Sequence, residues 1–258
     1  FETTGLDPAR PYRGMCFLSS SIGKELSLEE IRSFVASCRI DLVAVDFAWI
    51  THHWPRTDFA AVERLAAGLQ GDGVEVVALY RPRALRPSDA GVHYAVDRNG
   101  KIAASHNELC LAHEDSAAWG ARWGAEILGK LPSIDLVALY NLRPACACEK
   151  CRDGGSAALT AAFLARCRAE WEKVRPGIRI GHVGLADEYA AELDFFMPFL
   201  ALNRERAGGP PVDPAKLLAG ARTVRSRRKG RAVVPFAKVC WESATTNQTE
   251  DVVATMAE

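Results

Sequence analysis

The chain has 258 residues, and its 32 Lys and Arg residues balance its 32 Asp and Glu residues, so the formal net charge is zero. This balance argues against nucleic acid or an anionic membrane as a partner, because no overall field attracts either. Hydrophobic residues make up 48% of the chain and charged residues 25%, which is ordinary globular composition and sufficient for one large core. We therefore expect a single domain over residues 1–258.

Apolar runs of strand length alternate with longer segments of helical periodicity along the whole chain, a pattern typical of repeated β-α units. The predicted strands cover residues 14–19, 41–49, 74–80, 134–140, 178–183, 193–199 and 231–240. The predicted helices cover residues 28–38, 58–70, 116–131, 157–174, 187–192 and 214–228, and a seventh helix begins near Asn247.

This order of elements predicts an α/β fold, a TIM-type (β/α)8 barrel whose last β/α unit is missing from a chain that ends at Glu258. The strands are continuous hydrophobic runs, as expected where helices cover a parallel sheet. None of these runs shows the two-residue turns of an antiparallel hairpin. Ser27 and Glu30 have capping-box spacing at the first helix, and the long excursion 81–114 follows the third strand.

The compartment and the oligomeric state stay open. No apolar stretch approaches the ~20 residues that a transmembrane helix needs, which predicts a soluble protein without a membrane partner. The chain begins with Phe1 instead of Met, so we expect that a longer N-terminus was removed, by a signal peptidase or during preparation. The protein is then either cytoplasmic or exported.

Three cysteines within six residues, Cys146, Cys148 and Cys151, have the spacing of metal ligands. A tetrahedral zinc site needs a fourth ligand, for which Cys110 is the best candidate and His113 the next. Four protein ligands leave no open position, so the site would be structural. The alternatives are ordinary loop thiols or a disulfide. The remaining cysteines are interpreted as buried free thiols: Cys16, Cys38, Cys167 and Cys240.

Polar and aromatic side chains collect at the predicted carboxyl ends of the strands, where parallel barrels build their active sites. Such a mixture suits sugar rings, which stack on aromatic faces while their hydroxyls need directed partners. The candidate substrate-binding and catalytic residues are Asp46, Trp49, His52, Tyr80, Arg81, Tyr140, Asn141, His182, Lys238, Trp241 and Glu242.

Several of these residues also have a purely structural interpretation. Asp46 is either a catalytic acid or a strand-end acid that meets Arg81 across the barrel rim. His182 is equally a rim histidine with satisfied hydrogen bonds. Lys238 is either a base or an ion-pair partner of Glu242. Glu242, which follows the seventh strand, is the favoured catalytic acid, with a solvated loop glutamate as the alternative.

One segment resembles the barrel domain of family forty-two β-galactosidases and related glycosyl-hydrolase barrels. It contains Tyr140-Asn141, then the C-x-C-x-x-C motif, then a predicted helix with Trp171. The resemblance implies zinc bound by a cysteine of an earlier loop and the cluster, here Cys110, Cys146, Cys148 and Cys151. It also implies a catalytic glutamate after strand seven, where Glu242 stands. The family's acid after the strand-four Asn is missing, because Leu142 follows Asn141.

Two functions follow from these patterns. The first is a glycoside hydrolase in which Glu242 is nucleophile or base and Trp49, Trp54 and Trp241 stack on the sugar. The candidates for its acid are Asp46, Glu108, Glu114 and Asp115. The second is a non-catalytic carbohydrate-binding or scaffold barrel with a structural zinc site. Hydrolysis at an open metal site would need His52, His182 and Asp46 to converge.

Overall fold

The computed structural model describes residues 12–47, 57–81, 91–102, 109–139, 142, 146–154, 156–183, 190–197, 199–201, 232–233 and 236–238. Among these residues, no helix has the length and apolar character to cross a membrane.

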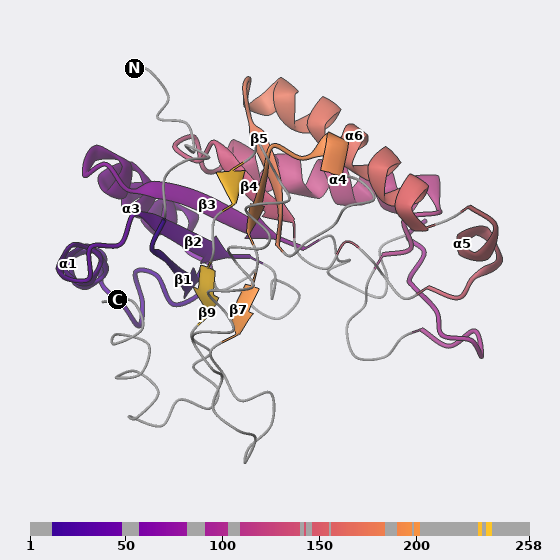
Figure 1. The fold of residues 1–258 in the computed structure, drawn as a ribbon, viewed down its shortest axis with the longest axis horizontal. Helices are drawn as coiled ribbons and strands as arrows, with labels where there is room; N and C mark the ends of the chain where they lie inside the picture. Colours follow the sequence, from indigo (N-terminus) through magenta and orange to yellow (C-terminus); the bar gives the residue numbers. More distant parts are fainter. Residues whose placement is uncertain are drawn as a thin grey trace, which may run out of the picture.

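The centre of the protein is a parallel seven-stranded sheet with the strand order β1-β2-β3-β4-β5-β6-β8. Each strand pairs with the next one in the same direction. The strands are β1 (Gly14–Leu18), β2 (Leu42–Asp46), β3 (Glu75–Tyr80), β4 (Leu136–Leu139), β5 (Arg179–Val183), β6 (Phe195–Met197) and β8 (Ala232–Val233). A second parallel pair joins β7 (Phe199–Ala201) to β9 (Phe236–Lys238). Because β9 also lies against β1, the sheet curls back towards its first strand (Figure 1).

The helices lie on the outside of this curled sheet (Figure 1). They are α1 (Leu28–Ser37), α3 (Phe59–Gly71), α4 (Glu114–Gly129), α5 (Glu149–Gly154) and α6 (Ser156–Val174), and a 3-10 turn, η2, covers Ala190–Glu192. The capping box at α1 is confirmed: Glu30 N–H donates to Ser27 Oγ, and the Glu30 carboxylate accepts from Ser27 N–H. Asp58 caps α3 by a single hydrogen bond, in which its carboxylate accepts from Ala61 N–H.

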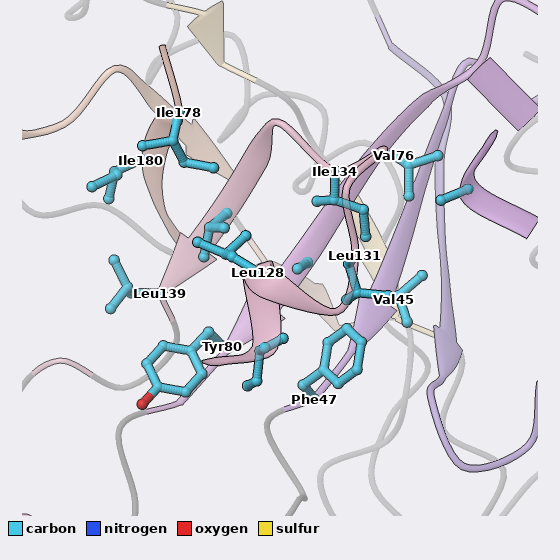
Figure 2. Close-up of a cluster of buried hydrophobic side chains, with 14 of the residues drawn as sticks. Val45, Phe47, Val76, Tyr80, Leu128, Leu131, Ile134, Leu139, Ile178 and Ile180 are labelled. Atoms are coloured by element: carbon cyan, nitrogen blue, oxygen red, sulfur yellow. The ribbon is translucent and has the colours of Figure 1, made fainter. Parts of the chain in front are cut away.

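Two apolar layers result from the alternation of side chains along the strands. The outer layer joins helix residues such as Leu128 to strand residues such as Val45, Val76 and Leu139 (Figure 2). The inner layer contains strand residues and Tyr12 but no helix residue; its members include Cys16, Ala44, Leu79, Ala138, Phe195 and Met197. The inner face of the curled sheet is therefore packed with side chains, as the interior of a barrel is.

Helices α4 and α6 pack closely against each other. Gly124 of α4 faces the indole of Trp171, which is fully buried and donates its Nε1–H to Ala121 O at 2.8 Å. A Cβ atom at position 124 would lie 2.6 Å from the Trp171 ring. Glycine is needed here for close approach, since the hydrogen bond and the burial prevent the indole from moving aside.

We expect Gly124→Ala to destabilise the protein by about 1–2 kcal/mol. Overpacking a tight core costs ~1–3 kcal/mol, which exceeds the gain of up to ~1 kcal/mol from replacing a helical glycine. In a Trp171→Phe background the smaller ring leaves room, so the same substitution should become neutral or favourable. Unfolding in denaturant measures both differences.

A matched control for this prediction is Gly129→Ala in the same helix. The nearest atom to a Cβ at position 129 is Val174 Cγ1 at 3.8 Å, an ordinary contact. Gly129→Ala should therefore leave stability unchanged or raise it slightly. Equal losses at Gly124 and Gly129 would show that helix geometry, and not the Trp171 contact, is responsible.

The observed architecture confirms a parallel α/β sheet with helices on its outer side. Eight β/α units are not seen among the described residues. The helix expected over residues 187–192 is represented by η2, with residues 184–189 outside the described part. The helices expected over residues 214–228 and from Asn247 also lie outside it.

Candidate functional site

Four cysteines converge at one side of the protein, as the spacing predicted. Cys110, Cys146, Cys148 and Cys151 place their Sγ atoms within 4.8 Å of one another. Cys110 comes from the segment before α4, and the other three come from the segment that includes the first turn of α5. Sulfur atoms from two loops that follow adjacent strands, β3 and β4, therefore meet at one point.

The sulfur distances fit a tetrahedral metal ion. Cys110 Sγ lies 3.5 Å from Cys151 Sγ and 3.6 Å from the Sγ atoms of Cys146 and Cys148. Four sulfurs at the usual Zn–S distance of ~2.3 Å stand ~3.8 Å apart at the corners of a tetrahedron. A disulfide would need sulfurs about 2.05 Å apart. All four cysteines are free thiols, so the disulfide alternative is not supported.

Cys110 is held firmly by the fold. Its side chain is fully buried, and its N–H donates to His93 O at 2.8 Å. The same His93 carbonyl accepts from Ser116 Oγ, and His93 N–H donates to that hydroxyl at 2.6 Å. Ser116 is buried in the first turn of α4. Cys110 is thus fixed to a helix on the outer side of the sheet.

A small hairpin contacts the C-x-C-x-x-C segment. Val96 pairs with Ile102 across a turn in which Asp97 accepts from the N–H groups of Asn99 and Lys101. Gly100 adopts φ +74°, a conformation that glycine tolerates best. Val96 N–H points at Cys146 Sγ, 3.5 Å away, and Val96 O accepts from Ala147 N–H at 2.7 Å. The hairpin therefore braces the C-x-C-x-x-C segment.

The thiols of the cluster differ in acidity. Burial raises the pKa of Cys110 far above its ordinary value and raises that of Cys151 to about 12. Burial also acts to raise the pKa of Cys148, but hydrogen bonds from the Cys151 backbone and the neighbouring thiols outweigh it and lower that pKa. A soft metal ion binds thiolates, so it would deprotonate the whole group on binding.

His113, the second candidate for the fourth ligand, has a different role. It does not belong to the group of converging ligand atoms. Its ring stacks on His93 with centroids 3.9 Å apart, and it is the N-cap residue of α4. Burial, followed by the charges of His93 and Lys150, lowers the pKa of His113. The geometry selects Cys110.

At the barrel mouth the structure brings Asp46 and Arg81 to the carboxyl ends of adjacent strands. Asp46 ends β2 and pairs in register with Leu18 and Leu79. Leu79 belongs to the inner layer, so Asp46 is on the inner face, and Arg81 follows two residues later with the same parity. Each is 5% exposed. Two charged residues thus occupy the interior side of the mouth.

Tyr80 and His182 lie on the other face of the sheet. Tyr80 is in the outer layer, donates its hydroxyl to Gly120 O at 2.7 Å and meets Trp171 edge to face. His182 is buried and pairs in register with Leu139 and Phe196, which both belong to the outer layer. Neighbouring strand residues point to opposite faces, so Tyr80 and Arg81 cannot both face the mouth. The site proposed below omits Tyr80 and His182.

Of the other residues predicted for the mouth, the structure describes only Lys238. Lys238 lies in β9, opposite Ala201 of β7. The remaining six lie outside the described residues: Trp49, His52, Tyr140, Asn141, Trp241 and Glu242. Four cysteines were expected to be buried thiols without a disulfide. Cys16 and Cys167 are buried, Cys38 is half-buried, and none of these three forms a disulfide; Cys240 lies outside the described residues.

Sequence reasoning missed the hairpin, the short helix α5 and the Ser116 link to Cys110. The hairpin had a signal, since Asn99-Gly100 is a common turn dipeptide between residues of strand character. The Ser116 link had none, because it joins distant segments. Helix α5 had none, because its six residues show no apolar periodicity.

The chain was compared with protein families, curated proteins and solved structures, and only the solved structures match it. No protein-family model matches the chain, and no curated protein matches its sequence. Solved structures do match. An α-L-fucosidase isoenzyme 2 from Paenibacillus thiaminolyticus superposes with a TM-score of 0.64 at 13% identity, over 96% of this chain and 49% of its own. A cold-adapted β-galactosidase from Rahnella sp. R3 gives 0.64 at 9% identity, over 96% of this chain and 55% of its own. An α-N-acetylgalactosaminidase from Bifidobacterium bifidum gives 0.57 at 11% identity, over 95% of this chain and 50% of its own.

The chain therefore shares its fold with glycoside hydrolases of the TIM-barrel type. It spans about half the length of these three enzymes. At such low identity the likeness concerns the fold alone, and the site must be argued from its residues.

Proposed function

We propose that this protein is a carbohydrate-active barrel and that it hydrolyses glycosidic bonds at the mouth formed by the carboxyl ends of its strands. The observation that carries the proposal is the pair Asp46 and Arg81, both buried on the inner face at the ends of β2 and β3. A buried carboxylate and guanidinium at this edge of a parallel barrel occupy the place where such enzymes act. The shared fold with glycosidases supports the same conclusion.

In this proposal Glu242 is the nucleophile or base and Asp46 protonates the leaving oxygen. Glycosidases use two carboxyl groups on opposite sides of the scissile bond. A retaining enzyme needs them about 5–5.5 Å apart, whereas an inverting enzyme needs about 6.5–9.5 Å to admit a water molecule. Arg81 and Asn141 would bind sugar hydroxyls, while Trp49, Tyr140 and Trp241 would stack on the ring. His52 and Lys238 complete the proposed site.

We also propose that the four cysteines bind one structural zinc ion, as in the family forty-two β-galactosidases that the sequence resembles. Soft thiolate donors in a tetrahedral arrangement favour zinc, and four protein ligands leave no position for a substrate. The ion would contribute no catalytic step. Its place is between the loops that follow β3 and β4, so it would stabilise the wall of the mouth.

A second candidate function is a carbohydrate-binding or scaffold barrel without catalysis. One observation favours it. The family that the sequence resembles carries its catalytic acid directly after the strand-four Asn, whereas here the residue after Asn141 is Leu142, which is fully buried. A carboxyl pair would then be incomplete unless Asp46 replaces the missing acid.

The deciding experiment measures hydrolysis of a broad panel of aryl glycosides by the purified protein, with binding of the corresponding free sugars measured by calorimetry in parallel. Hydrolysis of at least one glycoside, above a denatured control, is expected. Sugar binding without hydrolysis would establish the second candidate instead. Neither binding nor hydrolysis across the panel would contradict both.

A further inference from the structure

The C-x-C-x-x-C segment has almost none of the features that make a helix stable by itself. Helix α5 has six residues, whereas isolated helices shorter than about 12–15 residues are marginal in water. Glu149, Lys150 and Arg152 are exposed, and Cys146, Ala147, Cys148 and Cys151 are only half-buried. No described side chain of the segment 146–152 is buried in the apolar core.

Few contacts hold this segment to the rest of the chain. Between residues that the structure describes, two hydrogen bonds do so besides the sulfur contacts: Ala147 N–H to Val96 O, and Val96 N–H to Cys146 Sγ. Within the segment, the N–H groups of Cys151 and Arg152 both donate to Cys148 O at 3.1 Å, forming a single turn. Figure 1 shows α5 at the periphery of the molecule, away from the sheet.

The opposite half of the cluster is anchored without a metal. Cys110 is flanked by Leu109 and Leu111, which both belong to the outer apolar layer. Its backbone is tied to α4 through His93 and Ser116. Cys110 is therefore a fixed ligand, and the segment 146–154 is the part that must be brought to it.

We propose that residues 146–154 fold onto the protein only when their thiolates bind a soft metal ion such as zinc, whereas Cys110 and the barrel are ordered beforehand. Metal-binding free energy becomes folding free energy where the unbound segment lacks a core of its own. The metal thus controls the path of the chain between β4 and α6. This inference rests on the zinc site proposed above, but not on glycosidase activity.

Limited proteolysis tests it, because trypsin cleaves after Lys150 and Arg152, the two exposed basic residues of α5. Zinc-loaded protein and protein stripped with a chelator, both under reducing conditions, are digested briefly, and new termini are quantified by mass spectrometry. Stripping should accelerate cleavage at these two sites by about tenfold or more, since proteolysis follows the population of the opened segment. Cleavage at Arg122 and Lys173, exposed residues of α4 and α6, should not change. Adding zinc back should restore protection.

Two variants sharpen the result. At the lowest zinc concentration that loads the wild-type protein, Cys148→Ser should be cleaved like the stripped wild-type protein. Cys38→Ser should be cleaved like the loaded wild-type protein, because Cys38 is a free thiol at the end of α1, outside the cluster. Zinc content is measured on every sample. If the loaded protein contains stoichiometric zinc and stripping leaves cleavage unchanged, the inference of metal-dependent folding is overturned, whereas the zinc site stands. Absence of zinc binding would overturn the metal site as well. Equal acceleration at Arg122 and Lys173 would show global unfolding and overturn the local model.

Discussion

Glu242→Gln is expected to lower kcat on an aryl glycoside by about 10³-fold or more, since it removes the proposed nucleophile or base while preserving side-chain shape. Binding of the free sugar should persist, because an amide still accepts and donates hydrogen bonds. The measurement is steady-state hydrolysis combined with calorimetric binding. Glu126→Gln on the exposed surface of α4 is the matched control and should retain full activity.

The substitution Asp46→Asn, measured in the same assay, distinguishes a catalytic role of Asp46 as general acid from a purely structural role. A general acid matters most for a poor leaving group, so the loss should be large on an alkyl glycoside and small on an aryl glycoside with an acidic phenol. A purely structural Asp46 would lower both rates equally, together with thermal stability. Full activity of Glu242→Gln would exclude Glu242 from the chemistry and require another carboxylate as nucleophile or base.

Cys148→Ser is expected to weaken zinc binding by at least about 100-fold, because even the loss of a group that only orients a metal ligand costs ~10–100-fold. Cys148 is a good choice since its Sγ lies 3.6 Å from Cys110 Sγ and its carbonyl accepts from the first turn of α5. Competition with a coloured chelator gives the affinity, and elemental analysis gives the stoichiometry. Cys38→Ser should bind zinc like the wild-type protein.

Zinc should also raise the melting temperature of the wild-type protein in proportion to the logarithm of its free concentration, because a ligand that binds only the folded state stabilises it by mass action. Cys148→Ser should need at least about 100-fold more free zinc for the same rise in melting temperature. Stoichiometric zinc of unchanged affinity in Cys148→Ser would show that this sulfur is not a ligand.

The sequence was sufficient for features that depend on neighbouring residues. Ser27 and Glu30 predicted the start of α1, because a capping box needs only a serine and a glutamate three residues apart. The order of apolar runs and helical segments predicted a parallel sheet covered by helices. Cys146, Cys148 and Cys151 predicted a metal-ligand group, because their short spacing brings the thiols together whatever the rest of the fold does.

Features that depend on distant contacts were decided only by the tertiary structure. Both faces of β3 are apolar, so the sequence could not tell that Arg81 lies on the inner side while Tyr80 packs against α4. From the sequence, Cys110 and His113 were both acceptable as the fourth ligand. In the structure, contacts with His93 and Ser116 hold Cys110 beside the other three cysteines. Helix α5 had no signal, because a six-residue polar segment shows none of the apolar periodicity by which a helix is recognised in a sequence.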